Sequence, residues 1–274
     1  MFEKINTSIE LVKIALQYIK EEWELVAYAA ISFFTSCLIL VISIFWLTFI
    51  GAFNESGKEN LLYICLFIIY FVLYFITFFF NTAIIWTVKR KLEWKENRFW
   101  DWIKDSFSNI SKIIQWSFVS ASVSVILKII ESKFDENSIV WSIIMSILWW
   151  AWSILSYFAF PIMIIEWKWP KDAIKDSSLL FKRTWWEMAI LSVWTPYIFA
   201  LMMVLLTILS ILVIIFVSPM YWIISFAVSF IFMLILSGLT DTIVTTLLYH
   251  YASTETVPDN SAMRIAFSKV AKSK

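Results

Sequence analysis

Residues 188–240 form the longest stretch of the chain without a charged side chain, 53 residues in all. At about 1.5 Å per residue, a helix of this length is far longer than one crossing of a bilayer requires. The pair Ser218–Pro219 divides the stretch, because proline ends one helix and favours a turn. The stretch therefore predicts two membrane-spanning helices. So much apolar surface is stable in contact with lipid rather than with water.

Four more uncharged runs predict further spans, and composition supports them. Hydrophobic residues make up 61% of the chain and charged residues 16%, against about 45–50% and 25% in soluble domains. The third span is the shortest and reaches full depth only if Lys128 extends to the interface, with Glu131 one turn away. The six predicted spans cover residues 25–54, 60–88, 113–127, 137–165, 188–218 and 219–249. We expect an all-α polytopic bundle, with one transmembrane domain over 1–251 and a polar tail over 252–274.

Three charged segments, over residues 2–24, 89–112 and 166–188, have apolar residues at intervals of three and four. This spacing predicts amphipathic helices that lie in the membrane interface. All but three of the 22 basic residues fall in these segments or in the tail. The exceptions are Lys58, Lys128 and Lys133. Because basic residues accumulate on the cytoplasmic side, we expect both termini in the cytoplasm and the chain in the cytoplasmic (inner) membrane.

Two kinds of periodicity indicate a threefold internal repeat. The motif formed by Asp101, Ile103, Lys104, Asp105 and Ser106 returns further along the chain as Asp172, Ile174, Lys175, Asp176 and Ser177. Asn81, Pro161 and Asp241 are evenly spaced along the sequence and interrupt the second, fourth and sixth spans. These matches predict repeats over residues 1–91, 92–167 and 168–251. The alternative is a single irregular six-helix bundle.

Asn81, Pro161 and Asp241 are also the candidate polar sites inside the membrane, since an ionisable group there is a candidate functional residue. The alternative for Asp241 is local bonding near the cytoplasmic end of its span. A second candidate site is a basic cluster that could bind anionic headgroups, although it also serves as a topology signal. That cluster contains Lys89, Arg90, Lys91, Lys95 and Arg98.

No catalytic motif, metal-ligand spacing, cofactor-binding loop or nucleic-acid motif is found in the sequence. We therefore expect no cofactor and no bound metal, and membrane lipid or a membrane protein as the partner. The first functional hypothesis is a non-catalytic protein that organises lipid or a partner complex. The alternative is a small-solute or ion transporter, or a channel-like protein, built around the three intramembrane polar positions. An intramembrane enzyme is a third hypothesis.

The chain contains 17 tryptophans and only 3 glycines, whereas glycine is normally about 7% of residues. An aromatic belt at the membrane interface explains some of the tryptophans. It explains poorly those in loops, where a chain favours glycine. The imbalance favours the hypothesis that some of these codons are UGA, read as glycine in the source organism. Codons of the UGG type at Trp94, Trp167 and Trp169 would exclude it.

Several short motifs resemble an uncharacterised family of prokaryotic six-helix integral membrane proteins. They are Asn81-Thr82-Ala83, Phe160-Pro161, Glu166-x-Lys168-x-Pro170-x-x-Ala173-Ile174-Lys175-x-Ser177, Leu180-Phe181-Lys182-Arg183-Thr184-Trp185-x-Glu187 and Tyr249-x-Tyr251-Ala252. The family pattern has glycine where this chain has Trp167, Trp169 and Trp186. The chain is more distantly similar to the membrane domain attached to some glycerophosphodiester phosphodiesterases, whose catalytic barrel is absent here. The resemblance implies architecture and membrane location only.

Overall fold

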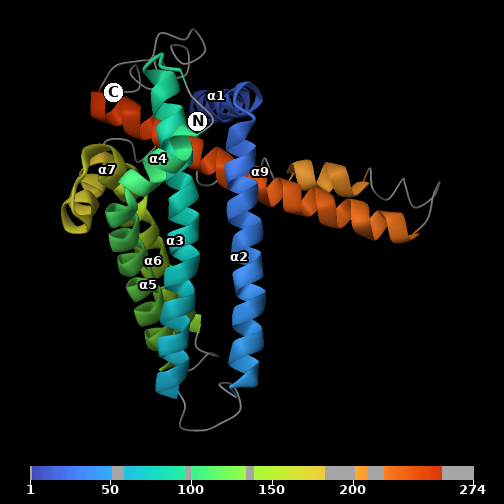
Figure 1. The fold of residues 1–274 in the computed structure, drawn as a ribbon, viewed down its shortest axis with the longest axis vertical. Helices are drawn as coiled ribbons and strands as arrows, with labels where there is room; N and C mark the ends of the chain where they lie inside the picture. Colours follow the sequence, from blue (N-terminus) through green and yellow to red (C-terminus); the bar gives the residue numbers. More distant parts are fainter. Residues whose placement is uncertain are drawn as a thin grey trace. The chain divides into compact units, whose positions relative to one another are not determined.

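The computed structural model describes residues 2–50, 59–96, 100–133, 139–182, 201–208 and 219–254. Within these ranges every regular element is an α-helix, so the all-α prediction is confirmed for them (Figure 1). The chain divides into two compact units. Unit 1 contains residues 1–30, 88–96 and 183–274, and unit 2 contains residues 31–87 and 97–182.

Five helical segments are long and apolar enough to cross a membrane. They are α2 (Glu24–Phe49), α3 (Glu59–Leu92), α5 (Ile110–Ser132), the pair α6 (Ile139–Ser156) and α7 (Ala159–Glu166), and α9 (Pro219–Thr254). These segments confirm helices at the predicted first to fourth and sixth spans. The predicted fifth span lies outside the described residues, apart from a helix over 201–208. Six spans and a threefold repeat therefore stay predictions.

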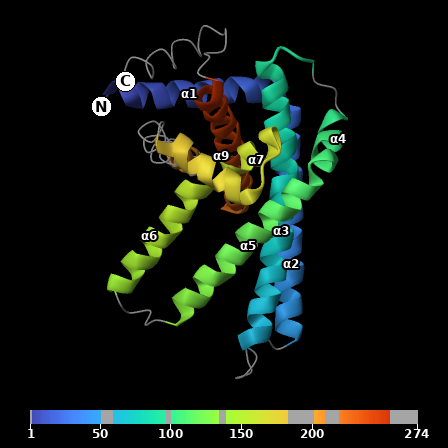
Figure 2. The same cartoon turned by 90° about the vertical axis from the view of Figure 1, so that its left-hand side faces the viewer.

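Within unit 1, α1 (Phe2–Glu21) packs against α9. The side chains of Val12, Ala15 and Ile19 are buried, whereas Lys13 and Lys20 are exposed. The chain turns at Glu22 and Trp23, so α1 lies across the first turns of α2 (Figures 1 and 2). A predicted amphipathic helix is thus present, but this part of its apolar face is covered by protein.

Aromatic side chains connect α3 with the other helices of unit 2. The ring of Phe78 lies 4.6 Å from that of Phe160 in α7 and 6.4 Å from that of Trp116 in α5. Trp116 also stacks on Trp152 of α6 at 6.0 Å, and its side chain is only 2% exposed. Phe78 and the buried Trp116 therefore join aromatic side chains of four helices into one core.

The second predicted amphipathic segment is shorter in the structure than in the prediction. Its helix, α4 (Asp101–Ser108), has eight residues, and α5 already begins at Ile110. Asn109 joins the two: its N–H donates to the carbonyl of Asp105, and its own carbonyl accepts from Lys112 and Ile113. Because Asn109 serves as C-cap and N-cap at once, the chain passes from one helix to the next without a loop.

Pro161 divides the predicted fourth span into α6 and α7. It is the third residue of α7, where a missing N–H costs little because the first N–H groups of a helix have no intrahelical acceptor. The break falls just before it, at Tyr157 and Phe158. The predicted interruption by Pro161 is thus seen as a helix break.

Candidate functional site

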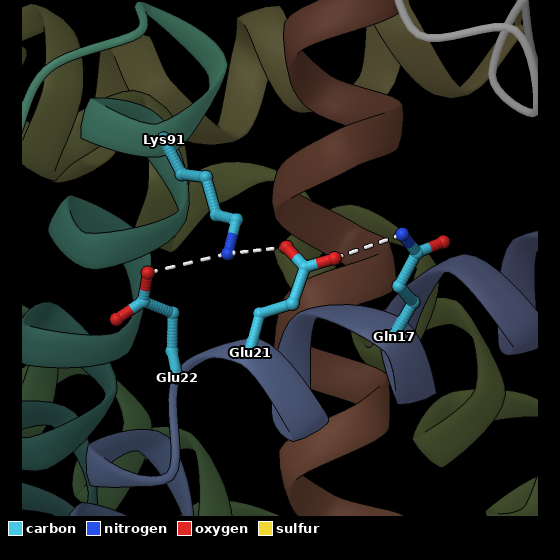
Figure 3. Close-up of polar contacts among 4 residues, drawn as sticks. All are labelled: Gln17, Glu21, Glu22 and Lys91. Atoms are coloured by element: carbon cyan, nitrogen blue, oxygen red, sulfur yellow. Dashed lines mark hydrogen bonds and ion pairs between the residues drawn. The ribbon is translucent and has the colours of Figure 1, made fainter.

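The ammonium of Lys91 connects the end of α3 to the end of α1 in unit 1. It lies 2.7 Å from a carboxylate oxygen of Glu21 and 3.2 Å from one of Glu22 (Figure 3). It also lies 5.1 Å from the centre of the Tyr18 ring. Gln17 donates a hydrogen bond of 2.8 Å to the other oxygen of Glu21. These contacts hold the end of α1 beside the end of α3, which is the end that we predict to face the cytoplasm.

Other members of the predicted headgroup-binding cluster also contact carboxylates. Lys95 lies 2.6 Å and Lys89 3.9 Å from oxygens of Glu93. Arg90 is half-buried, and Arg98 lies outside the described residues. These ion pairs lower the positive charge that the cluster presents to an anionic lipid. Headgroup binding by this cluster stays a prediction.

These contacts shift the titration of the carboxylates. Hydrogen bonds from Lys91 and then Gln17 hold the pKa of Glu21 below its ordinary value, and a hydrogen bond from Lys95 does the same for the pKa of Glu93. A lowered pKa means that the ionised carboxylate is favoured in the folded state. The stabilisation is therefore present above the unfolded-state pKa and is lost as the pH falls through the folded-state value.

We expect the Glu21→Gln variant to unfold at a lower temperature than the parent protein at pH 7. The difference should close as the pH falls from about 5 to about 3, because protonation then removes the same charge from the parent. Thermal unfolding in detergent over this pH range measures it. The exposed Glu96 of the same unit provides the control, and Glu96→Gln should track the parent throughout. A difference that persists at pH 3 would mean that Glu21 stabilises through its shape and not its charge.

The three predicted intramembrane polar positions are divided between the two units. Asn81 is half-buried in α3, and Pro161 is buried at the start of α7, both in unit 2. Asp241 belongs to unit 1 and is exposed on α9. Its neighbour Thr242 bonds to the carbonyl of Gly238. A polar cavity shared by the three positions stays a prediction.

The two copies of the repeated motif each supply a buried serine. Ser106 of α4 donates a hydrogen bond of 2.9 Å to the carbonyl of Phe79 in α3. Ser177, in the helix over 170–182, accepts one of 3.1 Å from the N–H of Phe158. Both serines are fully buried. Each copy thus attaches a surface helix to the preceding apolar helix, which is a structural role for the motif.

Lys112 was counted in the sequence only as a topology signal, yet its position is unusual. The residue is 4% exposed, and its ammonium lies 5.4 Å and 4.7 Å from the ring centres of Trp167 and Trp169. Among the described residues, no carboxylate is seen to pair with it. The neighbouring Lys168 instead forms ion pairs with Asp176 and Glu166, and its hydrogen bonds to Asp176 and then Glu166 raise its pKa. Cation–π contacts therefore stand in for a counter-ion at Lys112.

A pocket of about 460 Å³ lies between the linked ends of α5 and α6. The two helices run side by side from their linked ends toward α7 (Figure 2). One wall carries the ion pair that the sequence suggested, with Lys128 and Glu131 2.9 Å apart. The complete lining consists of Lys128, Glu131, Ser132, Trp141, Ser142, Met145, Ser146 and Trp149.

This pocket combines one cation, one anion and three hydroxyl groups with two indoles and a thioether. Such a lining suits an amphiphile that has a polar head and an apolar tail. In the part of the chain that the structure describes, no group of three His, Cys, Asp or Glu side chains is placed to bind a metal. The pocket could not be predicted from the sequence, because its two walls come from helices that only tertiary packing brings together.

Several apolar helices of spanning length, exposed along much of their surface, are the features of a membrane protein. The chain belongs to DUF6159, a family of unknown function, which matches residues 60–259. This confirms the resemblance to an uncharacterised family. The comparison does not extend to the glycerophosphodiester phosphodiesterases, and that similarity stays a prediction. No curated protein matches the chain.

Proposed function

We propose that this protein holds membrane lipid between its helices and so organises lipid in the cytoplasmic membrane, without catalysing a reaction. The pocket between α5 and α6 is the observation that carries the proposal. Both of its charged groups come from the end of α5, where Lys128 and Glu131 can reach the headgroup level. Met145 and Trp149 lie on α6 one and two turns beyond Ser142, deeper along the helix.

The arrangement of polar and apolar groups matches the shape of a lipid. From Ser142 to Trp149 the distance along an α-helix is about 10 Å. A headgroup that carries both charges would pair its anion with Lys128 and its cation with Glu131. The first part of an acyl chain would then lie against Met145 and Trp149. The hydroxyl of Ser142 can donate a further hydrogen bond to an ester oxygen, whereas the hydroxyls of Ser132 and Ser146 already donate to backbone carbonyls.

Orientation follows from the distribution of basic residues and is part of the proposal. Segments that hold 19 of the 22 basic residues would face the cytoplasm. Lys128 would then lie on the opposite side, so the pocket would take lipid from the outer leaflet. Both termini would be cytoplasmic.

Filling the pocket tests the function. We expect Met145→Trp to lose most of the lipid that copurifies with the parent protein, because the larger side chain occupies the space of the acyl chain. Native mass spectrometry and lipid extraction of the purified protein measure the bound lipid. Ile144→Trp is the matched control, since Ile144 is the adjacent, more exposed residue and does not line the pocket.

A second pair of variants tests the headgroup contact. Lys128→Gln should shift the bound lipid away from headgroups that carry a phosphate anion, whereas Lys133→Gln should not. Lys133 is an exposed cation at the end of the same helix and does not line the pocket. If Met145→Trp retains the lipid of the parent protein, the pocket does not hold it and the proposed function is wrong.

A further inference from the structure

Two residues other than glycine adopt a positive φ in the part of the chain that the structure describes, and both are tryptophan. They are Trp94 and Trp167, each with a φ of 56°. This left-handed region brings the Cβ atom of an L-residue close to the following carbonyl oxygen, at a cost that glycine avoids. A bulky side chain such as tryptophan is therefore an unexpected occupant of either position.

Trp94 lies just beyond the end of α3, where the hydrogen bonds define a Schellman motif. The N–H of Lys95 donates to the carbonyl of Arg90 at 2.9 Å, and the N–H of Trp94 donates to that of Lys91 at 3.2 Å. In this motif the left-handed residue is usually glycine. The side chain of Trp94 is 81% exposed, so burial of its indole does not offset the strain of the backbone.

Trp167 likewise follows the C-terminal end of a helix, α7. It follows the last helical residue, Glu166, with φ 56° and ψ 27°. Its side chain is 55% exposed. Its ring contacts the ammonium of Lys112, but Trp169 makes the shorter contact with that ammonium. At both helix ends the backbone thus has the conformation that glycine usually adopts at a C-cap, but the residue is tryptophan.

Trp116 shows the opposite combination. It lies inside α5, is almost fully buried and stacks on Trp152. Here the indole is required by the packing, and the backbone is helical. The tryptophans therefore occupy at least two kinds of position: exposed positions with a left-handed backbone and buried positions with a helical backbone.

We infer that residues 94 and 167 are glycine in the protein that the source cell makes, because their codons are UGA and that cell reads UGA as glycine. The same reasoning assigns UGG to the codon of Trp116. The inference does not depend on the proposed lipid function. With glycine at position 167, Lys112 would lose one of its two ring contacts and become more accessible to headgroups.

Mass spectrometry of the protein purified from its own cells tests the identity directly. Peptides that span residues 89–98 and 160–175 should have the mass of glycine at positions 94 and 167, lighter by an indolylmethyl group. The gene should carry UGA at both positions and UGG at 116. Tryptophan in either peptide, or a UGG codon at either position, overturns the inference for that position.

Stability measurements test the backbone argument separately. We expect Trp94→Gly and Trp167→Gly each to raise the thermal midpoint of the purified protein by about 2–4 °C. The control is Trp100→Gly, because Trp100 is similarly exposed at 68% but has a φ of −91°. It should not raise the midpoint. A gain with Trp100→Gly equal to that of the other two, or no gain at positions 94 and 167, would mean that the backbone does not require glycine there.

Discussion

Replacing Trp116 by alanine is expected to lower the free energy of unfolding by about 2–3 kcal/mol, somewhat less than in a water-soluble protein. Large-to-small changes of aromatic residues cost about 3–5 kcal/mol in the cores of water-soluble proteins. Part of that cost is the transfer of apolar atoms from water, which is absent when the separated helix faces lipid. The packing part remains, because Trp116 contacts Phe78, Trp152 and their helices.

An unfolding titration with a denaturing detergent, in mixed micelles, measures this loss. Phe118→Ala is the matched control, since Phe118 lies on the same helix, is 56% exposed and contacts the ring of Phe67. It should cost less than about 1 kcal/mol. Equal losses for the two variants would show that the buried Trp116 contributes no more to the stability of unit 2 than an exposed ring.

The helices could be predicted from the sequence because an uncharged run of spanning length is a signal that needs no tertiary information. The run that follows Glu59 and the run that begins near Ile139 each give a helix close to the predicted place. Boundaries next to charged segments were less accurate. The start of α5 at Ile110 depends on Asn109, whose backbone ends one helix and begins the next.

The partners of the charged residues could not be predicted. Lys91 and Lys112 lie in the same basic segment and count equally in the topology argument. In the structure, Lys91 pairs with carboxylates at the end of α1, whereas Lys112 lies against two indole rings that follow α7. Periodicity and charge counting place such residues on a side of the membrane, but only packing determines what each ammonium contacts.

For the tryptophans, the sequence raised the question and the structure selected the positions. Composition suggested that some tryptophan positions are glycine positions, but it could not select them. Trp94, Trp167 and Trp169 were named because they lie in predicted loops, and a left-handed backbone now gives an independent reason for Trp94 and Trp167 but not for Trp169. Trp116 would have been equally suspect by composition alone, although its packing requires the ring.

Ser177→Ala is expected to lower the free energy of unfolding by about 1–3 kcal/mol, because it leaves the buried N–H of Phe158 without its acceptor. That N–H lies at the break between α6 and α7, at the N-cap of α7, where no intrahelical carbonyl replaces the hydroxyl. The loss should also loosen the helix over 170–182, so amide exchange there should rise together with exchange at Phe158.

Ser106→Ala is the control, because it also removes a buried serine hydroxyl. Ser106 is the donor in its hydrogen bond, whereas Ser177 is the acceptor. Ser106 donates to the carbonyl of Phe79 inside α3, and that carbonyl keeps its helical hydrogen bond when the hydroxyl is removed. We therefore expect a loss of only about 0.5–1 kcal/mol. Detergent unfolding of the two variants side by side measures the difference. If Ser106→Ala costs as much as Ser177→Ala, the two serines stabilise their helices through packing and not through the hydrogen bond that each makes. The repeated motif would then be a packing element in both copies.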